Sequence, residues 1–199
     1  MSCLMALALL ITLKIRSIRK TRAIVGFPYQ QRPEAMEVYV DTDHAGCLET
    51  RKSTSGGVIM YGCHGIKTWS ATQQVIALSS GEAEYYGMVR GAGNALGLSG
   101  VFRDMGIKHE ITMYTDSSAA KGISSRRGLG KVRHVELNAL WLQDQVARGR
   151  IAVRKISGEE NISDSLTKPA TPDRIKQTMR GTLQRVVPGR HAIMPEVAK

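Results

Sequence analysis

The sequence has few cysteines and no apolar run long enough to cross a membrane. Three cysteines in 199 residues exclude a disulfide scaffold and suit a reducing compartment. The chain also lacks internal repeats and low-complexity tracts. Its 42% of hydrophobic and 23% of charged residues are typical of a chain that folds around its own core.

The longest apolar stretch, residues 3–13, is far below the roughly 20 residues of a transmembrane helix. A signal peptide carries its positive charge before the apolar stretch, whereas here Lys14 and Arg16 follow it. We interpret the stretch as a helix that packs on a domain outside this chain, with a membrane anchor as the alternative.

Acidic residues are scarce at both ends of the chain. Residues 1–35 hold six Lys or Arg and one acid, and residues 165–199 hold seven and two. The middle carries a net charge of only +1 out of the total of +11. Two basic tails favour a polyanionic partner such as nucleic acid. Solvated ends without a partner have the same composition, and both interpretations remain open here.

Several segments carry the signature of β-strands. In residues 36–43, the apolar side chains of Met36, Val38 and Val40 alternate with their neighbours, which is the period of a strand. The carboxylates of Asp41 and Asp43 would then point to the same side. Further β-rich runs occupy residues 58–61, 66–69, 111–115 and 151–156.

Helices are expected between and after these strands. Ser79 and Glu82 form a capping box that begins a helix, and a short helix follows Asp116. Two more helices are expected over residues 135–146 and 171–188. The order is three strands, a helix, a strand, two helices, a strand and a helix. It predicts an α/β fold in which helices flank a mixed sheet.

Four acids occupy conspicuous places in this pattern. Asp41 and Asp116 end two strands, Asp164 follows the last strand, and Glu84 lies one turn inside the long helix. Because the ends of neighbouring strands meet at one sheet edge, these carboxylates would cluster and attract a hard divalent cation such as Mg²⁺. The alternative is that Asp116 caps a helix and the others are turn or solvated residues.

Six segments occur in the order and spacing of a known family: YVDTDHAGC, RKSTSGGVIMYG, ALSSGEAEYYG, YTDSSAA, KVRHVELNALWLQDQV and ISDSLTKP. Together they resemble the ribonuclease H region of the Pol polyprotein of copia-type LTR retrotransposons. The resemblance implies a ribonuclease H-like domain over residues 36–169. Residues 1–35 would be a basic extension with an apolar helix, a remnant of the connection to reverse transcriptase. Residues 170–199 would form a basic C-terminal helix and tail.

The resemblance also implies a function. The fold would hold a five-stranded mixed sheet flanked by helices, and the activity would be metal-dependent endonucleolytic hydrolysis of the RNA strand of RNA–DNA hybrids during reverse transcription. Catalysis and the binding of two Mg²⁺ ions, for which Mn²⁺ would substitute, would fall to Asp41, Glu84, Asp116 and Asp164. Asp43 and Glu82 are rivals of Asp41 and Glu84, each two residues away.

One departure from the family concerns the loop before the last aspartate, where many ribonuclease H domains carry a histidine. Lys155 stands near that place here. A lysine with its ordinary pKa of about 10 is a poor proton shuttle at neutral pH. The chain also lacks a recognisable reverse transcriptase palm, protease or integrase. The rival interpretation is therefore a catalytically decayed retrotransposon fragment that only binds nucleic acid.

Basic residues are the candidates for phosphate contacts. Residues 121–133 hold five Lys or Arg, three glycines and no acid, which is typical of an exposed loop. The nucleic-acid-binding candidates are Arg126, Arg127, Lys131, Arg133 and Lys155. The implied partners are an RNA–DNA hybrid, recognised by its shape and 2′-hydroxyls, and a reverse transcriptase domain missing from this chain; no membrane partner is expected. By resemblance, the chain would act in the cytoplasm, in the virus-like particle of a retroelement.

Overall fold

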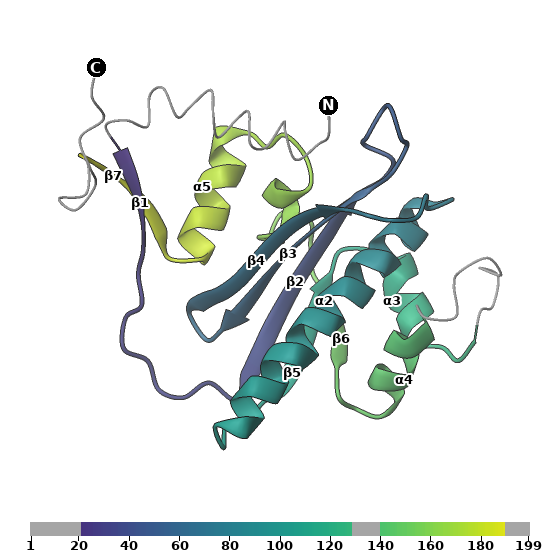
Figure 1. The fold of residues 1–199 in the computed structure, drawn as a ribbon, viewed down its shortest axis with the longest axis horizontal. Coiled ribbons are helices and arrows are strands. Elements are labelled where there is room, and N and C mark those ends of the chain that lie inside the picture. Colours follow the sequence, from purple (N-terminus) through teal and green to yellow (C-terminus); the bar gives the residue numbers. More distant parts are fainter. Residues whose placement is uncertain (1–20, 129–139, 190–199) are drawn as a thin grey trace.

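The computed structural model describes residues 21–128 and 140–189 (Figure 1). Its strands are β1 (Thr21–Val25), β2 (Ala35–Asp43), β3 (Thr54–Tyr61), β4 (His64–Thr72), β5 (Glu110–Thr115), β6 (Ala152–Lys155) and β7 (Gln184–Pro188). Its helices are α2 (Ser80–Asp104), α3 (Ser118–Ser124), α4 (Trp141–Ala147), the short 3₁₀ helix η2 (Asp164–Leu166) and α5 (Pro172–Gly181).

Five strands form one mixed sheet in the order β4-β3-β2-β5-β6. β2, β3 and β4 run antiparallel, whereas β5 lies parallel to both β2 and β6. Met36, Val38 and Val40 of the central strand β2 are fully buried, as their alternation predicts. The expectation of a five-stranded mixed sheet flanked by helices is confirmed.

The long helix α2 lies close against one face of this sheet. It begins as the capping box predicts, since the Ser79 side chain accepts a hydrogen bond from the backbone amide of Glu82 at 3.2 Å. Two glycines permit the close approach. A Cβ atom at Gly91 would lie 2.7 Å from a methyl group of Val40, and one at Gly87 would lie 2.4 Å from the Thr42 hydroxyl. The glycines therefore set how near α2 comes to the end of β2.

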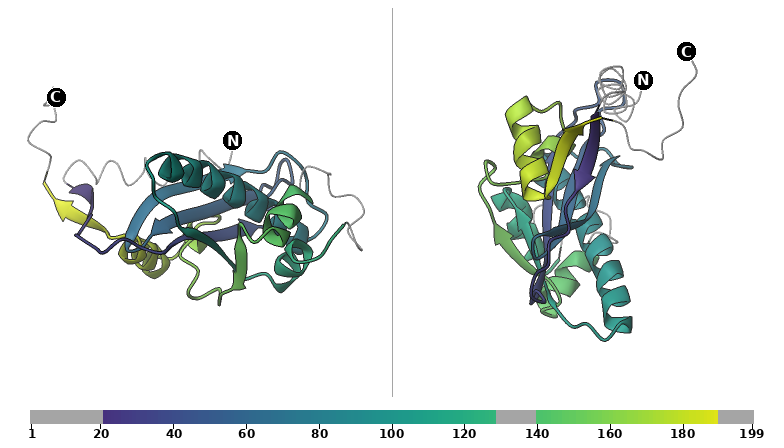
Figure 2. Two further views of the ribbon diagram at one scale, coloured as in Figure 1. Left: turned by 90° about the horizontal axis from the view of Figure 1, so that it is seen from below. Right: turned by 90° about the vertical axis from the view of Figure 1, so that its left-hand side faces the viewer.

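The segment around η2 and helix α5 covers part of the opposite face, so that α2 and α5 flank the sheet from two sides (Figure 2). Asn161 donates a hydrogen bond to the carbonyl of Val40 at 2.9 Å, and the Ser70 hydroxyl donates to the carbonyl of Leu166 at 2.6 Å. These bonds hold the residues that follow β6 against the central strand β2 and the edge strand β4.

The C-terminal helix is shorter than predicted. The expectation of one helix over residues 171–188 is wrong, because α5 ends at Gly181 and residues 184–188 form β7. Leu183 has a left-handed φ of 53°, which turns the chain out of the helix, and the β-branched Val186 and Val187 then lie in the strand. β7 pairs antiparallel with β1 in a separate two-stranded sheet.

Several expectations concern residues that lie outside the described ranges. They include the apolar run of residues 3–13, most of the last tail, and the first part of the helix expected over residues 135–146. Within residues 21–128 and 140–189, no helix is both long and apolar enough to span a membrane.

Candidate functional site

Three carboxylates from three different elements meet at one edge of the sheet. Asp41 lies near the end of β2, Asp116 directly follows β5, and Glu84 lies in the second turn of α2. Each offers an oxygen atom, and these atoms all lie within 4.8 Å of one another. The parallel pairing of β2 and β5 brings the two aspartates together, and the close approach of α2 adds the glutamate.

Two of the three carboxyl groups of the cluster are buried, and that of Asp116 is half-buried. Asp41 is 4% exposed and Glu84 is 9% exposed, and Glu84 Oε2 has no hydrogen-bond partner within residues 21–128 and 140–189. Burial raises the pKa of Glu84 to about 9, and the charges of Asp41 and Asp116 add to the rise. Burial also raises the pKa of Asp41, against which a hydrogen bond from Thr167 and the charge of Lys168 act. Ionising these buried carboxyl groups is costly unless a positive charge offsets them, so this arrangement favours a bound cation.

The two rival acids have other partners. Asp43 accepts a hydrogen bond from the backbone amide of Thr54, its cross-strand neighbour. Glu82 is buried and accepts a hydrogen bond from the backbone amide of Leu78 at 3.0 Å, which fixes the start of α2. Neither carboxylate belongs to the three that converge. The geometry therefore favours Asp41 over Asp43 and Glu84 over Glu82.

Asp164, the fourth acid, lies beside the cluster rather than in the group of three. Lys168 Nζ stands 2.5 Å from Asp164 Oδ1, and Arg174 Nε stands 3.7 Å from Asp164 Oδ2. The charge of Asp164 still contributes to the raised pKa of Asp41, although burial is the main cause of that rise. Asp164 thus faces the same edge but is paired with two cations.

Thr167 and Lys168 both contact these acids, although neither was among the residues predicted for the site. The Thr167 hydroxyl donates a hydrogen bond to Asp41, and the Lys168 ammonium pairs with Asp164. The spacing of Asp164 and Lys168 was an available signal, because residues four apart face each other on a helical turn.

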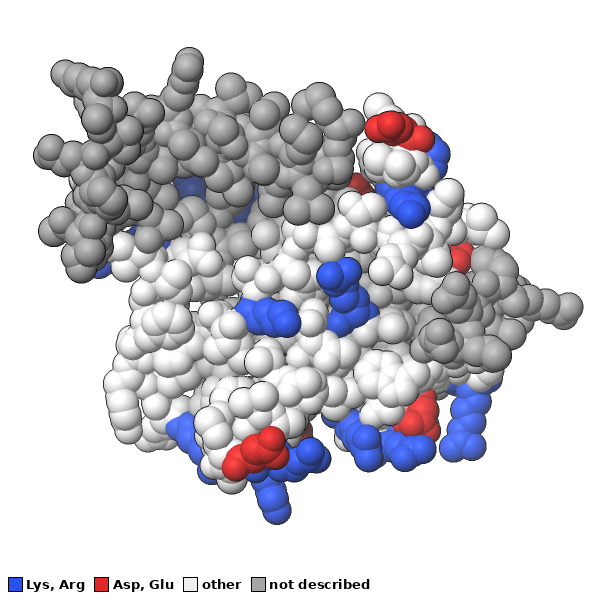
Figure 3. Space-filling model, in the orientation of Figure 1, with Lys and Arg blue, Asp and Glu red and all other residues white. Residues whose placement is uncertain are grey.

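The residues expected to bind phosphate differ in their exposure and in their contacts. Arg127 is exposed, whereas Arg126 is half-buried near Tyr85, where its charge partly offsets the rise in the pKa of Tyr85 that burial causes. Lys155 Nζ donates to the Ser118 hydroxyl at 2.6 Å. Lys131 and Arg133 lie outside the described residues. On the face seen in Figure 3, the visible Lys and Arg side chains are scattered rather than joined in one basic patch.

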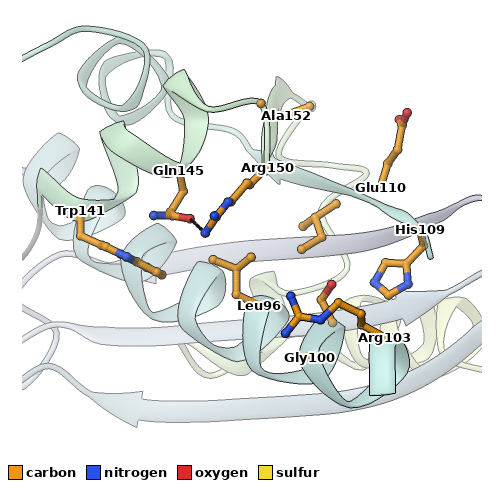
Figure 4. A pocket seen from close by; sticks show the side chains of 12 residues that line it. Leu96, Gly100, Arg103, His109, Glu110, Trp141, Gln145, Arg150 and Ala152 are labelled. Atoms are coloured by element: carbon orange, nitrogen blue, oxygen red, sulfur yellow. Dashed lines mark hydrogen bonds between the residues drawn. The ribbon is translucent and has the colours of Figure 1, made fainter. Parts of the chain in front are cut away.

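A pocket of about 690 Å³ opens at the other end of the parallel strands, where β5 and β6 begin. Leu96 of α2 and Ile111 of β5 contribute apolar surface to it. Figure 4 shows the guanidinium groups of Arg103 and Arg150 reaching into the pocket from opposite walls, whereas Glu110 points away. This end of the sheet is therefore basic, in contrast to the carboxylate cluster.

Curated relatives cover about two thirds of the chain, and no family model matches it. The retrovirus-related Pol polyprotein from transposon TNT 1-94 of Nicotiana tabacum is 30% identical over 132 residues, which is 65% of this chain and 10% of that protein. The corresponding polyprotein from transposon RE2 of Arabidopsis thaliana is 27% identical over 138 residues, 68% of this chain and 10% of that protein. The chain thus spans about a tenth of the length of the curated relatives it matches.

Among solved structures, a ribonuclease H1 isolated from compost by a metagenomic approach is 18% identical, with a TM-score of 0.47. The match covers 67% of this chain and 93% of that one. The copia-type resemblance stated from the motifs agrees with the sequence relatives. Over about two thirds of its length, the chain is similar in sequence to one segment of the retrovirus-related Pol polyproteins of plant transposons.

Proposed function

We propose that the chain is a metal-dependent endonuclease that hydrolyses the RNA strand of RNA–DNA hybrids during retrotransposon reverse transcription, alongside a reverse transcriptase domain. The observation that carries the proposal is the convergence of Asp41, Glu84 and Asp116, where one oxygen of the buried Glu84 has no partner in the part of the chain that the structure describes. The Pol polyprotein relatives support it, because reverse transcription is the process that produces such hybrids.

The donor set fits Mg²⁺. It consists of carboxylate oxygens, and the hard ion Mg²⁺ prefers oxygen ligands and is usually held by one or two carboxylates plus substrate phosphate. Asp41, Glu84 and Asp116 would hold the metal, and Asp164 would complete a site for two ions. When bound, two such ions activate the attacking water and stabilise the leaving oxygen of a phosphodiester, which leaves a 3′-hydroxyl and a 5′-phosphate.

The chain's own residues prepare this site. The hydrogen bond from Thr167 orients the Asp41 carboxylate. The Glu84 carboxylate accepts a hydrogen bond from the backbone amide of Thr42. Basic side chains such as Arg127 and Lys155 would contact phosphates of the substrate. Recognition would follow the shape of the hybrid and its 2′-hydroxyls rather than base sequence.

The test is cleavage of a labelled RNA strand in an RNA–DNA hybrid, with Mg²⁺ and with EDTA. We expect cutting that depends on metal and that Asp116→Asn abolishes. The matched control is Asp104→Asn at the exposed end of α2, which should cut like the parent. Single-stranded RNA and duplex DNA of the same sequence test the specificity for hybrids.

Binding of the hybrid without cleavage by the parent chain would contradict the proposal. That result would favour the rival interpretation, a catalytically decayed fragment that binds nucleic acid. Equal cleavage by the parent and Asp116→Asn would instead assign the chemistry to other residues.

A further inference from the structure

Lys168 is held beside the carboxylate cluster by a turn with fixed packing. It follows η2, four residues after Asp164, and its ammonium lies 2.5 Å from the Asp164 carboxylate. The turn packs tightly on β3, since a Cβ atom at Gly56 would lie 2.8 Å from Thr167 Cγ2 and 2.9 Å from Leu166 Cβ. The position of the ammonium therefore depends on the fold around it as well as on its flexible side chain.

The charge of Lys168 bears on all four acids. Its hydrogen bond with Asp164 raises its pKa above the ordinary value, and the charges of Asp164, Asp41 and Asp116 add to that rise. The same charge acts on Glu84, where it opposes the rise in pKa caused mainly by burial. The Lys168 ammonium, in contact with Asp164, therefore partly offsets the negative charge of the cluster when no other cation is near.

A monovalent ammonium and a divalent ion compete for the same carboxylates. Asp164 is 15% exposed in its side chain and is paired with Lys168 and Arg174, so its oxygens are engaged by protein cations. The Lys168 side chain is 54% exposed, so the ammonium can leave toward solvent while its backbone stays in place.

We propose that Lys168 is a built-in counter-ion of the carboxylate cluster, which holds Asp164 apart from the other three acids until a divalent ion displaces its ammonium. The inference rests on the proposed function for the identity of the metal site. Lys168 is in this respect a positioning residue: it sets the metal affinity of the cluster and the availability of its fourth carboxylate.

The experiment is calorimetric titration of the full chain with Mn²⁺ alone, in the absence of nucleic acid. Removal of a positive charge next to the site should tighten binding, and we expect about 10-fold higher affinity for Lys168→Met. Lys168→Arg keeps the charge and should stay within about twofold of the parent. The matched control is Lys176→Met, which removes an exposed lysine paired with Asp173 in α5 and should leave the affinity unchanged.

A second comparison tests the role of Asp164. In an Asp164→Asn background, Lys168→Met should change Mn²⁺ affinity much less than in the parent, because the carboxylate that the ammonium holds is gone. Lys168→Gln provides a polar variant of similar reach should Lys168→Met fold poorly.

The outcomes separate the two proposals. Equal Mn²⁺ affinity of the parent, Lys168→Met and Lys168→Gln would overturn the role of Lys168 and leave the metal site intact. Binding by Lys168→Met but not by the parent would support the counter-ion role in its strongest form. Absence of Mn²⁺ binding in the parent and in both neutral variants would overturn both proposals.

Discussion

The two ends of the parallel strands carry opposite charges, and they differ in how far water reaches those charges. At the carboxyl ends of β2 and β5, Asp41 and Glu84 are buried against each other and against Asp116. At the amino ends of β5 and β6, Arg103 and Arg150 line an open pocket and are exposed to solvent (Figure 4). Water solvates the arginines, whereas it has little access to the carboxylates.

This difference shows which end of the sheet needs a ligand. Ionising a buried carboxyl group without a counter-charge costs the fold on the order of several kcal/mol. An exposed charge in water has no comparable cost. The carboxylate end is thus poised for a cation, and the pocket end is stable as it stands.

The largest expected effect comes from Glu84. Glu84→Gln keeps the shape of the side chain but removes its charge, and we expect RNA cleavage to fall about 10³-fold because a metal ligand is weakened. In EDTA near neutral pH the melting temperature should change little, because the raised pKa keeps Glu84 protonated and the amide replaces a neutral carboxyl group. Glu82→Gln, two residues away, should keep its hydrogen bond to Leu78 and retain cleavage. Loss of activity in Glu82→Gln alone would reverse this assignment.

The second-largest expected effect is a dependence of the free energy of unfolding on pH. The pKa of Glu84 is about 9 in the folded chain, well above its ordinary value, so between these values the folded state holds a proton that the unfolded state has released. The free energy of unfolding in EDTA should therefore fall as pH rises from about 5 to 9, by up to about 1.4 kcal/mol per pH unit.

Asp41 contributes in the same direction, since burial raises its pKa too. Saturating Mg²⁺ should flatten the slope, because it favours the ionised carboxylates, and Glu84→Gln should reduce it. Urea denaturation at several pH values measures both. The slope of the free energy of unfolding against pH is measured in EDTA, in saturating Mg²⁺ and for Glu84→Gln. Equal slopes in all three would show that the buried glutamate is not the source of the pH dependence.

A smaller effect is expected where the turn after η2 packs on β3. Gly56→Ala would place a methyl group within 2.9 Å of both Thr167 and Leu166, which must move. We expect a loss of about 1–3 kcal/mol in the free energy of unfolding and weaker Mn²⁺ binding, because Thr167 loses its contact with Asp41. Gly97→Ala in α2, where a Cβ would meet no atom of the described residues within 4 Å, is the control and should be neutral or stabilising. Equal stability of the two variants would contradict this account of the turn.

Much of the fold could be predicted from local patterns. The alternation of Met36, Val38 and Val40 gave the central strand, and the Ser79 capping box gave the start of α2. The end of the last helix could not be predicted this way. Leu183 and Val186 continue the apolar spacing of α5, but the left-handed turn at Leu183 and the pairing of β7 with the distant β1 depend on tertiary contacts.

In the candidate site, too, some residues could be predicted from local patterns, whereas others depend on tertiary contacts. Strand ends and motifs indicated Asp41, Glu84 and Asp116, but period-2 alternation gives Asp41 and Asp43 the same face and cannot separate them. The amide of Thr54, on the neighbouring strand, distinguishes them by binding Asp43. The pairing of Asp164 with Lys168 and Arg174 likewise depends on how η2 and α5 pack, which the linear spacing only partly indicates.

The smallest expected effect belongs to the basic pocket, and it completes the comparison of the two ends. Arg103→Met removes an exposed charge that makes no ion pair among the described residues, so the free energy of unfolding should change by less than about 0.5 kcal/mol. Mn²⁺ affinity and hybrid cleavage should match those of the parent. Urea denaturation and the cleavage assay measure these quantities. A loss of stability comparable to that of Gly56→Ala would mean that the arginine is engaged by residues beyond the described ranges, and the contrast between a buried acidic end and a solvated basic end would no longer hold.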